Sequence, residues 1–246
     1  MKFLAAFATI VALASPGLAQ KEVPTAPVVA VDPAATPDTL WHLQLSTGGT
    51  VVVQLRPDKA PGHVERIRTL TRAGFYDGLL FHRVIEGFMA QTGDPQGTGQ
   101  GGSPLPDLKA EFNDTPHLRG TVSMARATEP NSANSQFFIT FMPVMRLDNT
   151  YTAFGRVVSG MQFVDAIKRG EGPEGGVATE PSRIVKAWIE TDGPNAPRVP
   201  LPAVSLSAPI AAAETPAATE APAVATPAAT PPPAPVKKRK KVLAIF

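Results

Sequence analysis

The stretch FHRVIEGFMAQTGDP at residues 81–95, followed later by SQFFITF at residues 135–141, contains most of the information in this chain. The two stretches carry one arginine, two glutamines, a methionine and several phenylalanines, which could line an apolar groove with a polar wall. They offer no activated nucleophile, no cluster of metal ligands and no acid/base pair. This set of residues favours the rotation of a bond over its cleavage.

Strand alternation sorts these residues onto two faces. In an extended strand, the side chains of Met89 and Gln91 point to the same side. The side chains of Gln136 and Phe138 also share one side of their strand, and Phe137 points to the opposite side. One face can therefore be core while the other is the wall of a binding site. Each phenylalanine taken alone could equally be plain core packing. The two glutamines are harder to explain in that way, because a buried amide needs hydrogen-bond partners.

The first residues predict export. Lys2 is followed by a short apolar run and by small residues before a cut after Ala19, which is the pattern of a secretory signal peptide over residues 1–19. The run is too short to span a bilayer as a helix. An uncleaved anchor or a buried N-terminal helix would be the alternatives. We expect an exported, periplasmic protein.

The folded unit should lie at residues 39–193. Residues 20–38 contain several prolines and no helical period, which is typical of a linker. Residues 194–246 form a tail in which twelve of the 27 prolines of the chain lie between positions 194 and 235. Alanine and proline offer too little bulky apolar surface to offset chain entropy, so we expect this tail to be disordered.

The charge of the chain is concentrated at its end. The formal net charge of +2 falls to −3 when the five charges of KKRKK at 237–241 are removed. This block could associate weakly with anionic head groups of the envelope or with another polyanion, or it could be a solvated end without a partner. A nucleic-acid role has the same charge pattern but conflicts with export, so no nucleic-acid partner is expected. The absence of cysteine excludes disulfides and thiol catalysis.

Within the folded unit the pattern favours short strands and two helices. A hairpin is predicted over 41–45 and 50–55, and a helix begins at Pro61 and stops at Gly74. Such a set suggests a closed antiparallel barrel, because closure removes exposed strand edges. The other predicted elements are strands at 79–85, 88–92, 120–125, 136–141, 152–158 and 183–190 and a second helix at 161–169.

Four blocks of sequence resemble the cyclophilin family of peptidyl-prolyl cis-trans isomerases in its bacterial form. They are FYDGLLFHRVIEGFMAQTGDPQGTGQGG (75–102), TVSMARA (121–127), NSANSQFFITF (131–141) and LDNTYTAFGRVVSGM (147–161). The resemblance covers about residues 39–190. It implies a mainly β fold, an eight-stranded closed antiparallel β-barrel capped by two α-helices, with the active groove on the outer surface of the barrel.

The resemblance also implies roles for single residues. Arg83 matches the catalytic arginine, and Gln91, the second catalytic position, would support Arg83 and the rotating carbonyl. The backbone of Arg126, between Ala125 and Ala127, would pair with the main chain of a proline-containing polypeptide. The other substrate-binding positions implied are Phe88, Met89, Gln136, Phe138, Leu147 and Tyr151. Neither a cofactor nor a metal is implied, and we expect a monomer.

Two positions depart from the best-known eukaryotic members. Arg146 stands where they have a tryptophan that contributes to cyclosporin binding, and Tyr151 replaces a histidine that lines the proline pocket. We therefore expect weak cyclosporin affinity. Isomerase activity is less affected, because tyrosine still provides a ring and a hydroxyl group.

Several other signals have plainer explanations. The G-x-G-x-x-G pattern at 97–102 is followed by Ser-Pro-Leu-Pro where a nucleotide-binding fold needs a helix, so a glycine-rich loop is the better account. His82 is expected to be a hydrogen-bonding scaffold residue and not a base. Asp94, Glu111 and Asp114 are expected to be solvated or to stabilise turns.

Two classes of function stay open on the sequence. The first is an exported isomerase that accelerates rotation of X–Pro bonds and assists protein folding. The second is a noncatalytic chaperone or binding module that uses the same groove to hold proline-containing segments. Turnover of an X–Pro peptide separates them.

Overall fold

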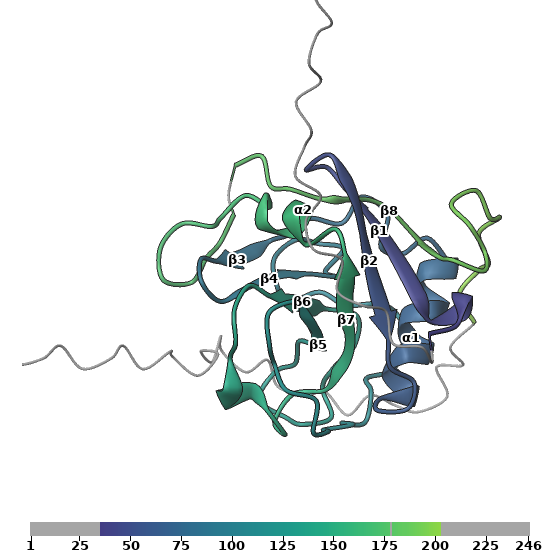
Figure 1. The fold of residues 1–246 in the computed structure, drawn as a ribbon, viewed down its shortest axis with the longest axis horizontal. Coiled ribbons are helices and arrows are strands. Elements are labelled where there is room, and N and C mark those ends of the chain that lie inside the picture. The colour runs from purple at the N-terminus through teal and green to yellow at the C-terminus, as the bar shows by residue number, and fades with distance from the viewer. Residues whose placement is uncertain (1–34, 178, 203–246) are drawn as a thin grey trace, which may run out of the picture.

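The structure is a computed structural model that describes residues 35–177 and 179–202 (Figure 1). The predicted signal peptide, nearly all of the predicted linker and the basic block lie outside the described residues. Within the described ranges, no helix has the length and apolar character needed to cross a bilayer.

Eight strands and two helices form the fold of the described residues. Figure 1 shows how these elements are arranged. The strands are β1 Leu40–Leu45, β2 Gly49–Leu55, β3 Arg83–Ile85, β4 Met89–Thr92, β5 Thr121–Met124, β6 Phe137–Thr140, β7 Ala153–Ser159 and β8 Ile184–Ile189. The helices are α1 Pro61–Arg72 and α2 Met161–Asp165, and single 3₁₀ turns occur at η1 Pro37–Thr39 and η2 Met145–Leu147. The predicted hairpin and the order of the elements are confirmed.

All eight strands belong to one antiparallel sheet in the order β3-β4-β6-β5-β7-β2-β1-β8. The sheet curls into a half-barrel. Its two edge strands do not pair directly. Instead, the segment before β3 bonds to the first residue of β8 and to the residues just before it. Phe81 N–H donates to Ser182 O at 2.9 Å, and Ile184 N–H donates to Leu79 O at 2.9 Å. The mainly β fold with two helices is confirmed, and a fully closed barrel stays a prediction.

Aromatic rings fill the inside of the curl. The Trp41 ring lies 5.0 Å from Phe137 and 5.4 Å from Tyr76, and Phe137 lies 6.3 Å from Phe154, in edge-on or tilted arrangements. All four side chains are fully buried. Such offset ring pairs add packing energy beyond their buried area. This core fixes the side of β6 that faces inward.

Helix α1 packs against β8, and its N-terminus is capped by a residue that is distant in the sequence. Pro61 occupies the first turn, and Val64, Ile67 and Leu70 are buried at helical spacing as predicted. Ala60 gives no side-chain cap. The backbone N–H groups of Gly62 and His63 instead donate to the carboxylate of Glu111, each at 3.0 Å.

Helix α2 is shorter than the predicted span of 161–169. After Asp165 the chain tightens, with Ile167 N–H donating to Val164 O at 3.1 Å. The guanidinium of Arg169 donates to the carbonyls of Asp165 and Ile167, which ends the helix. Gly170 N–H then bonds to Val84 O at 2.8 Å, in β3. These local contacts and the long-range bond to β3 override the apolar period that predicted a longer helix.

Two buried histidine–carboxylate pairs hold loops to the sheet. Nδ1 of His63 lies 2.6 Å from Glu111, and Nδ1 of His117 lies 2.9 Å from Asp148 while its Nε2 lies 3.1 Å from the hydroxyl of Ser123. Burial lowers the pKa of both histidines below the usual 6.5, against the raising effect of their carboxylates. Both imidazoles are therefore neutral near pH 7.

We expect Phe137→Ala to lower the free energy of unfolding by about 3–5 kcal/mol, because the side chain is fully buried among three other rings. Phe112→Ala is the matched control, since that ring is 40% exposed, and it should cost about 1 kcal/mol or less. Urea denaturation measures both. Equal losses in the two variants would contradict this assignment of the core.

The buried histidines predict a loss of stability on mild acidification. Because their folded-state pKa values lie below 6.5, the unfolded chain binds more protons than the native state as the pH falls. The free energy of unfolding should be highest above this pH and fall below it, by at most about 1.4 kcal/mol per pH unit for each histidine. Urea unfolding between pH 7.5 and 5 measures the slope, and His117→Gln should flatten it. A stability that is constant or rises in this window would contradict the prediction.

Candidate active site

An apolar cluster lies on the outer side of the sheet, separate from the aromatic core. Its buried members are Met89, Phe138, Val144 and Leu147. The alternation predicted for β4 and β6 is confirmed, because Ala90 and Phe137 belong to the main core while the adjacent Met89 and Phe138 belong to this outer cluster. The half-buried residues packed against it are Ile85, Phe88, Ala125 and Tyr151.

A chain of three polar side chains borders the apolar cluster. Nε2 of Gln136 donates to the carbonyls of Gly99 at 2.9 Å and Gly101 at 2.8 Å. Its Oε1 accepts a hydrogen bond of 2.8 Å from Nε2 of Gln91. The Oε1 of Gln91 then accepts from Nη1 of Arg83 at 3.4 Å. Both glutamines thus have the partners that a half-buried amide requires.

Arg83 begins β3 and is paired in register with Gln91 on β4. A second hydrogen bond, from its Nε to the carbonyl of Glu174 at 3.0 Å, fixes the guanidinium from the other side. Nη2 has no hydrogen-bond partner among residues 35–177 and 179–202. Burial lowers the pKa of Arg83, partly offset by Glu174 and Tyr151, but a guanidinium stays protonated at neutral pH. The site therefore holds a fixed cation that can still donate.

The glycine-rich loop supports Gln136 and is itself held by Asp94. This buried carboxylate accepts backbone hydrogen bonds from Gln96, Thr98 and Gly99 at 2.6–2.9 Å. A Cβ at Gly101 would lie 2.0 Å from Oδ1 of Asp94, so only glycine fits there. The turn-stabilising role predicted for Asp94 is confirmed, and the loop borders the candidate site.

Arg126 lies at the opposite border. Its guanidinium donates four hydrogen bonds to the carbonyls of Ala127, Thr128 and Thr150, at 2.9–3.3 Å. It also covers the ring of Tyr151 at 4.7 Å, and that ring meets Phe138 edge-on at 5.9 Å. The backbone N–H and C=O of Arg126 have no hydrogen-bond partner in the part of the chain that the structure describes. They are available to another extended chain.

Leu147 is brought to the cluster by η2. Asp148, the next residue, accepts hydrogen bonds from the backbone N–H and the ring of His117, which hold its pKa below the usual range. The His117 ring stacks on Phe138 at 6.3 Å. The buried pair described above therefore also positions two members of the apolar cluster.

Three further predictions have specific outcomes. His82 is buried, but neither ring nitrogen meets a partner at hydrogen-bond geometry within the described residues, so the predicted hydrogen-bonding role is not seen. Burial lowers its pKa, and it adds no positive charge beside Arg83. Glu111 caps α1, and Asp114 pairs with Lys59 at 2.7 Å. The carboxylates do not form a common site.

Sequence reasoning did not identify several contributors to the site. Val144 and Ile85 belong to the apolar cluster, and the carbonyls of Gly99, Gly101 and Glu174 orient the polar side chains. Val144 lies in a loop without a period, and a carbonyl has no signature in sequence. The alternation in β3 would have placed Ile85 on the face of Arg83.

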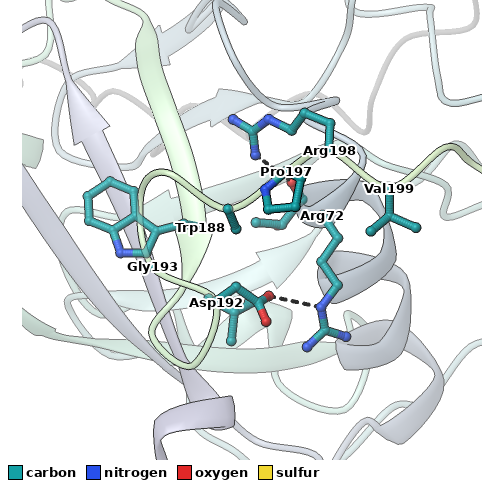
Figure 2. Close-up of a pocket in the computed structure, with 10 residues that line it drawn as sticks. Arg72, Trp188, Asp192, Gly193, Pro197, Arg198 and Val199 are labelled. Atoms are coloured by element: carbon teal, nitrogen blue, oxygen red, sulfur yellow. Dashed lines mark hydrogen bonds and ion pairs between the residues drawn. The ribbon is translucent and has the colours of Figure 1, made fainter.

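A cavity of about 210 Å³ lies away from this site, between the end of α1, the end of β8 and the segment 192–199 (Figure 2). Arg72 and Asp192 pair across it at 2.9 Å, and Val199 N–H donates to Arg72 O at 3.0 Å. Arg198 pairs with Asp77 beside it. Ligand sites are usually larger than about 300 Å³. We interpret this cavity as a packing gap between the segment 192–199 and the end of α1.

Comparison with known proteins shows the family. The model of the cyclophilin type peptidyl-prolyl cis-trans isomerase family matches residues 42–189. A probable peptidyl-prolyl cis-trans isomerase from Brucella suis is 51% identical over 170 residues, covering 65% of this chain and 86% of the relative. Peptidyl-prolyl cis-trans isomerase B from Bacillus subtilis is 43% identical over 132 residues, covering 53% of this chain and 91% of the relative.

Solved structures of similar fold belong to the same family. A cyclophilin from Hirschia baltica has a TM-score of 0.57 and 29% identity, covering 65% of this chain and 77% of that one. A cyclophilin from Cryptosporidium parvum, solved in the presence of the dipeptide Ala-Pro, has a TM-score of 0.57 and 27% identity, covering 61% of this chain and 98% of that one. The chain belongs to the cyclophilin-type peptidyl-prolyl cis-trans isomerase family and is an enzyme of that isomerase class.

Proposed function

We propose that Arg83 accelerates X–Pro rotation by hydrogen-bonding the prolyl nitrogen when the amide is twisted. The apolar cluster holds the proline ring during this rotation. The observation that carries the proposal is the guanidinium itself, which is fixed by two hydrogen bonds next to the cluster and keeps Nη2 without a partner in the described residues.

The physical chemistry of the amide explains why one donor is enough. Resonance gives the X–Pro bond partial double-bond character and a rotation barrier of about 18–20 kcal/mol. In the twisted amide the prolyl nitrogen recovers its lone pair and accepts a hydrogen bond, which the planar forms do not. A donor at that nitrogen therefore binds the transition state more tightly than either ground state. No covalent bond is made or broken.

The seating of the substrate follows from the residues around Arg83. The proline ring would rest on Phe88, Met89, Phe138 and Leu147. The free backbone groups of Arg126 would bond to the substrate main chain. Gln136 would contact the residue that precedes proline, and Tyr151 would close the pocket wall. The Cryptosporidium parvum relative solved with Ala-Pro supports a proline-containing peptide as the ligand class.

Gln91 acts in this proposal as a positioning residue. Its amide is engaged at both ends, by Gln136 and by Arg83, which leaves it little capacity for the substrate. Its contribution is to keep the guanidinium turned toward the cluster. Such preorganised donors avoid reorganisation during the reaction.

We expect Arg83→Ala to lower kcat/KM for an X–Pro peptide by about 10²-fold or more, by analogy with removal of one transition-state donor elsewhere. Arg83→Lys should lose most of the rate as well, because an ammonium lacks the planar fork of donors. Arg156→Ala, a half-buried arginine on β7, is the control for loss of charge. NMR exchange spectroscopy or a protease-coupled assay measures turnover, and circular dichroism verifies folding. A folded Arg83→Ala variant as fast as the parent would refute the proposed role.

We further propose that the enzyme works outside the cytoplasm, assists the folding of exported proteins, and uses KKRKK at 237–241 to associate with anionic envelope surfaces. The support is the pattern of residues 1–19 and the charge of the tail. Contacts of the C-terminal segment reach residue 201, since Leu201 packs against the main core. A truncation that spares the folded part should therefore begin after residue 202.

We expect deletion of residues 203–246 to leave turnover of a short peptide within about twofold of the parent. The same deletion should weaken binding to anionic lipid vesicles by at least about tenfold, because each basic residue near such a surface contributes about 1 kcal/mol. Vesicle cosedimentation measures this, with zwitterionic vesicles as the control. Unchanged vesicle binding would remove the proposed role of the basic block.

A further inference from the structure

On the basis of the proposed function, we propose that Arg146 forms a subsite for an acidic side chain that follows the proline of the substrate. The ligand class is a carboxylate carried one or two residues after the proline. This inference concerns sequence preference and leaves the proposed chemistry at Arg83 unchanged.

Arg146 is held in place without using its hydrogen-bond donors. It is exposed, it lies in η2 beside Leu147, and its Cζ lies 4.8 Å from the centroid of the Phe88 ring. A cation–π contact uses the charge and none of the N–H groups. In the described residues the guanidinium of Arg146 forms neither a hydrogen bond nor an ion pair. Five donors therefore remain available at the edge of the apolar cluster.

The other arginines around the site differ from Arg146. Arg126 also lies over a ring, but its guanidinium is committed to four backbone hydrogen bonds. Arg169 lies over Phe141 at 4.1 Å and pairs with Glu86. Among residues 35–177 and 179–202, Arg146 has no such acidic partner, so its charge is available to a ligand.

The acids that are near Arg146 in sequence already have partners. Asp148, two residues later, accepts from the backbone and the ring of His117. Glu86, two residues before Phe88, is paired with Arg169. A carboxylate for Arg146 would therefore have to come from outside the described part of the chain. Planar guanidinium groups favour carboxylates because two parallel N–H groups match the two oxygens.

The register of the sheet places this subsite relative to the proline. Met89 pairs with Thr140 and Thr92 pairs with Phe137, so Phe88 and Gln136 lie at opposite ends of the β4–β6 ladder. With the residue before proline at the Gln136 end and the proline ring against Phe88, the residues after proline extend beyond Phe88, where Arg146 lies over its ring.

The expected preference is modest because the subsite is exposed. An exposed ion pair contributes little to the free energy of binding. We therefore expect only about a two- to fivefold preference for glutamate over glutamine after proline. The preference should appear in KM, because Arg146 does not touch the rotating bond. It should shrink in 0.5 M salt, where exposed charges are screened.

The experiment compares four C-terminally amidated peptides by NMR exchange. Three carry Ala-Pro followed by Glu, Gln or Lys, and the fourth carries Glu before proline. The parent enzyme is compared with Arg146→Gln and with Lys186→Gln, which removes the same charge from β8. We expect the parent and Lys186→Gln to favour Pro-Glu over Pro-Gln and Pro-Lys, and Arg146→Gln to lose this preference through a higher KM for Pro-Glu.

The outcomes separate this inference from the proposed function. Turnover of all peptides at equal rates, or a Pro-Glu preference that persists in Arg146→Gln, would overturn the subsite while leaving the isomerase mechanism intact. A preference that depends on Arg146 but appears only for Glu before proline would overturn the placement after proline. Absence of turnover for every peptide would overturn the proposed function and the subsite together.

Discussion

The two hydrogen bonds from Gln136 to backbone carbonyls of the glycine-rich loop set the direction of every polar contact that leads to Arg83. A carbonyl can only accept, so the amide nitrogen of Gln136 must face the loop and its oxygen must face Gln91. The amide of Gln91 is then oriented in turn, with its oxygen toward the guanidinium. The loop carbonyls thus orient the guanidinium of Arg83 on its Gln91 side, while the carbonyl of Glu174 holds its Nε.

The fold makes this arrangement rigid. The main core holds one face of β4 and β6, so the opposite face presents Met89 and Phe138 beside Gln91. Asp94 binds the backbone of the loop at three N–H groups, and this close approach leaves no space for a side chain at Gly101. A fixed donor beside an apolar surface costs no reorganisation when the amide twists, which is the condition for electrostatic catalysis.

Much of this could be predicted from the sequence because the deciding patterns are local. The alternation of side chains around Phe137 and Phe138 predicted which residues face the core and which face the candidate site. The spacing of apolar residues in 61–72 predicted α1. The family resemblance added the positions of Arg83 and Arg126, and the geometry brings both to the edge of one apolar cluster.

The remaining features depend on contacts between distant parts of the chain. The cap that Glu111 provides for α1 joins residues that are 48 and 49 positions apart. The chain after α2 is bound to β3 through the hydrogen bond from Gly170 N–H to Val84 O, against the apolar period that predicted a longer helix. The contact of Arg146 with Phe88 likewise joins η2 to the start of β4. No local period encodes such pairs, so they appear only once the fold is known.

The most direct test of the central claim is a double-mutant cycle on kcat with Arg83→Ala and Gln91→Ala, which breaks the chain of hydrogen bonds between Gln136 and Arg83. If Gln91 acts on the reaction by orienting Arg83, its loss should slow the parent severalfold and leave the residual kcat of Arg83→Ala unchanged. Multiplying losses in the double variant would show that the two residues act independently, and would contradict the account.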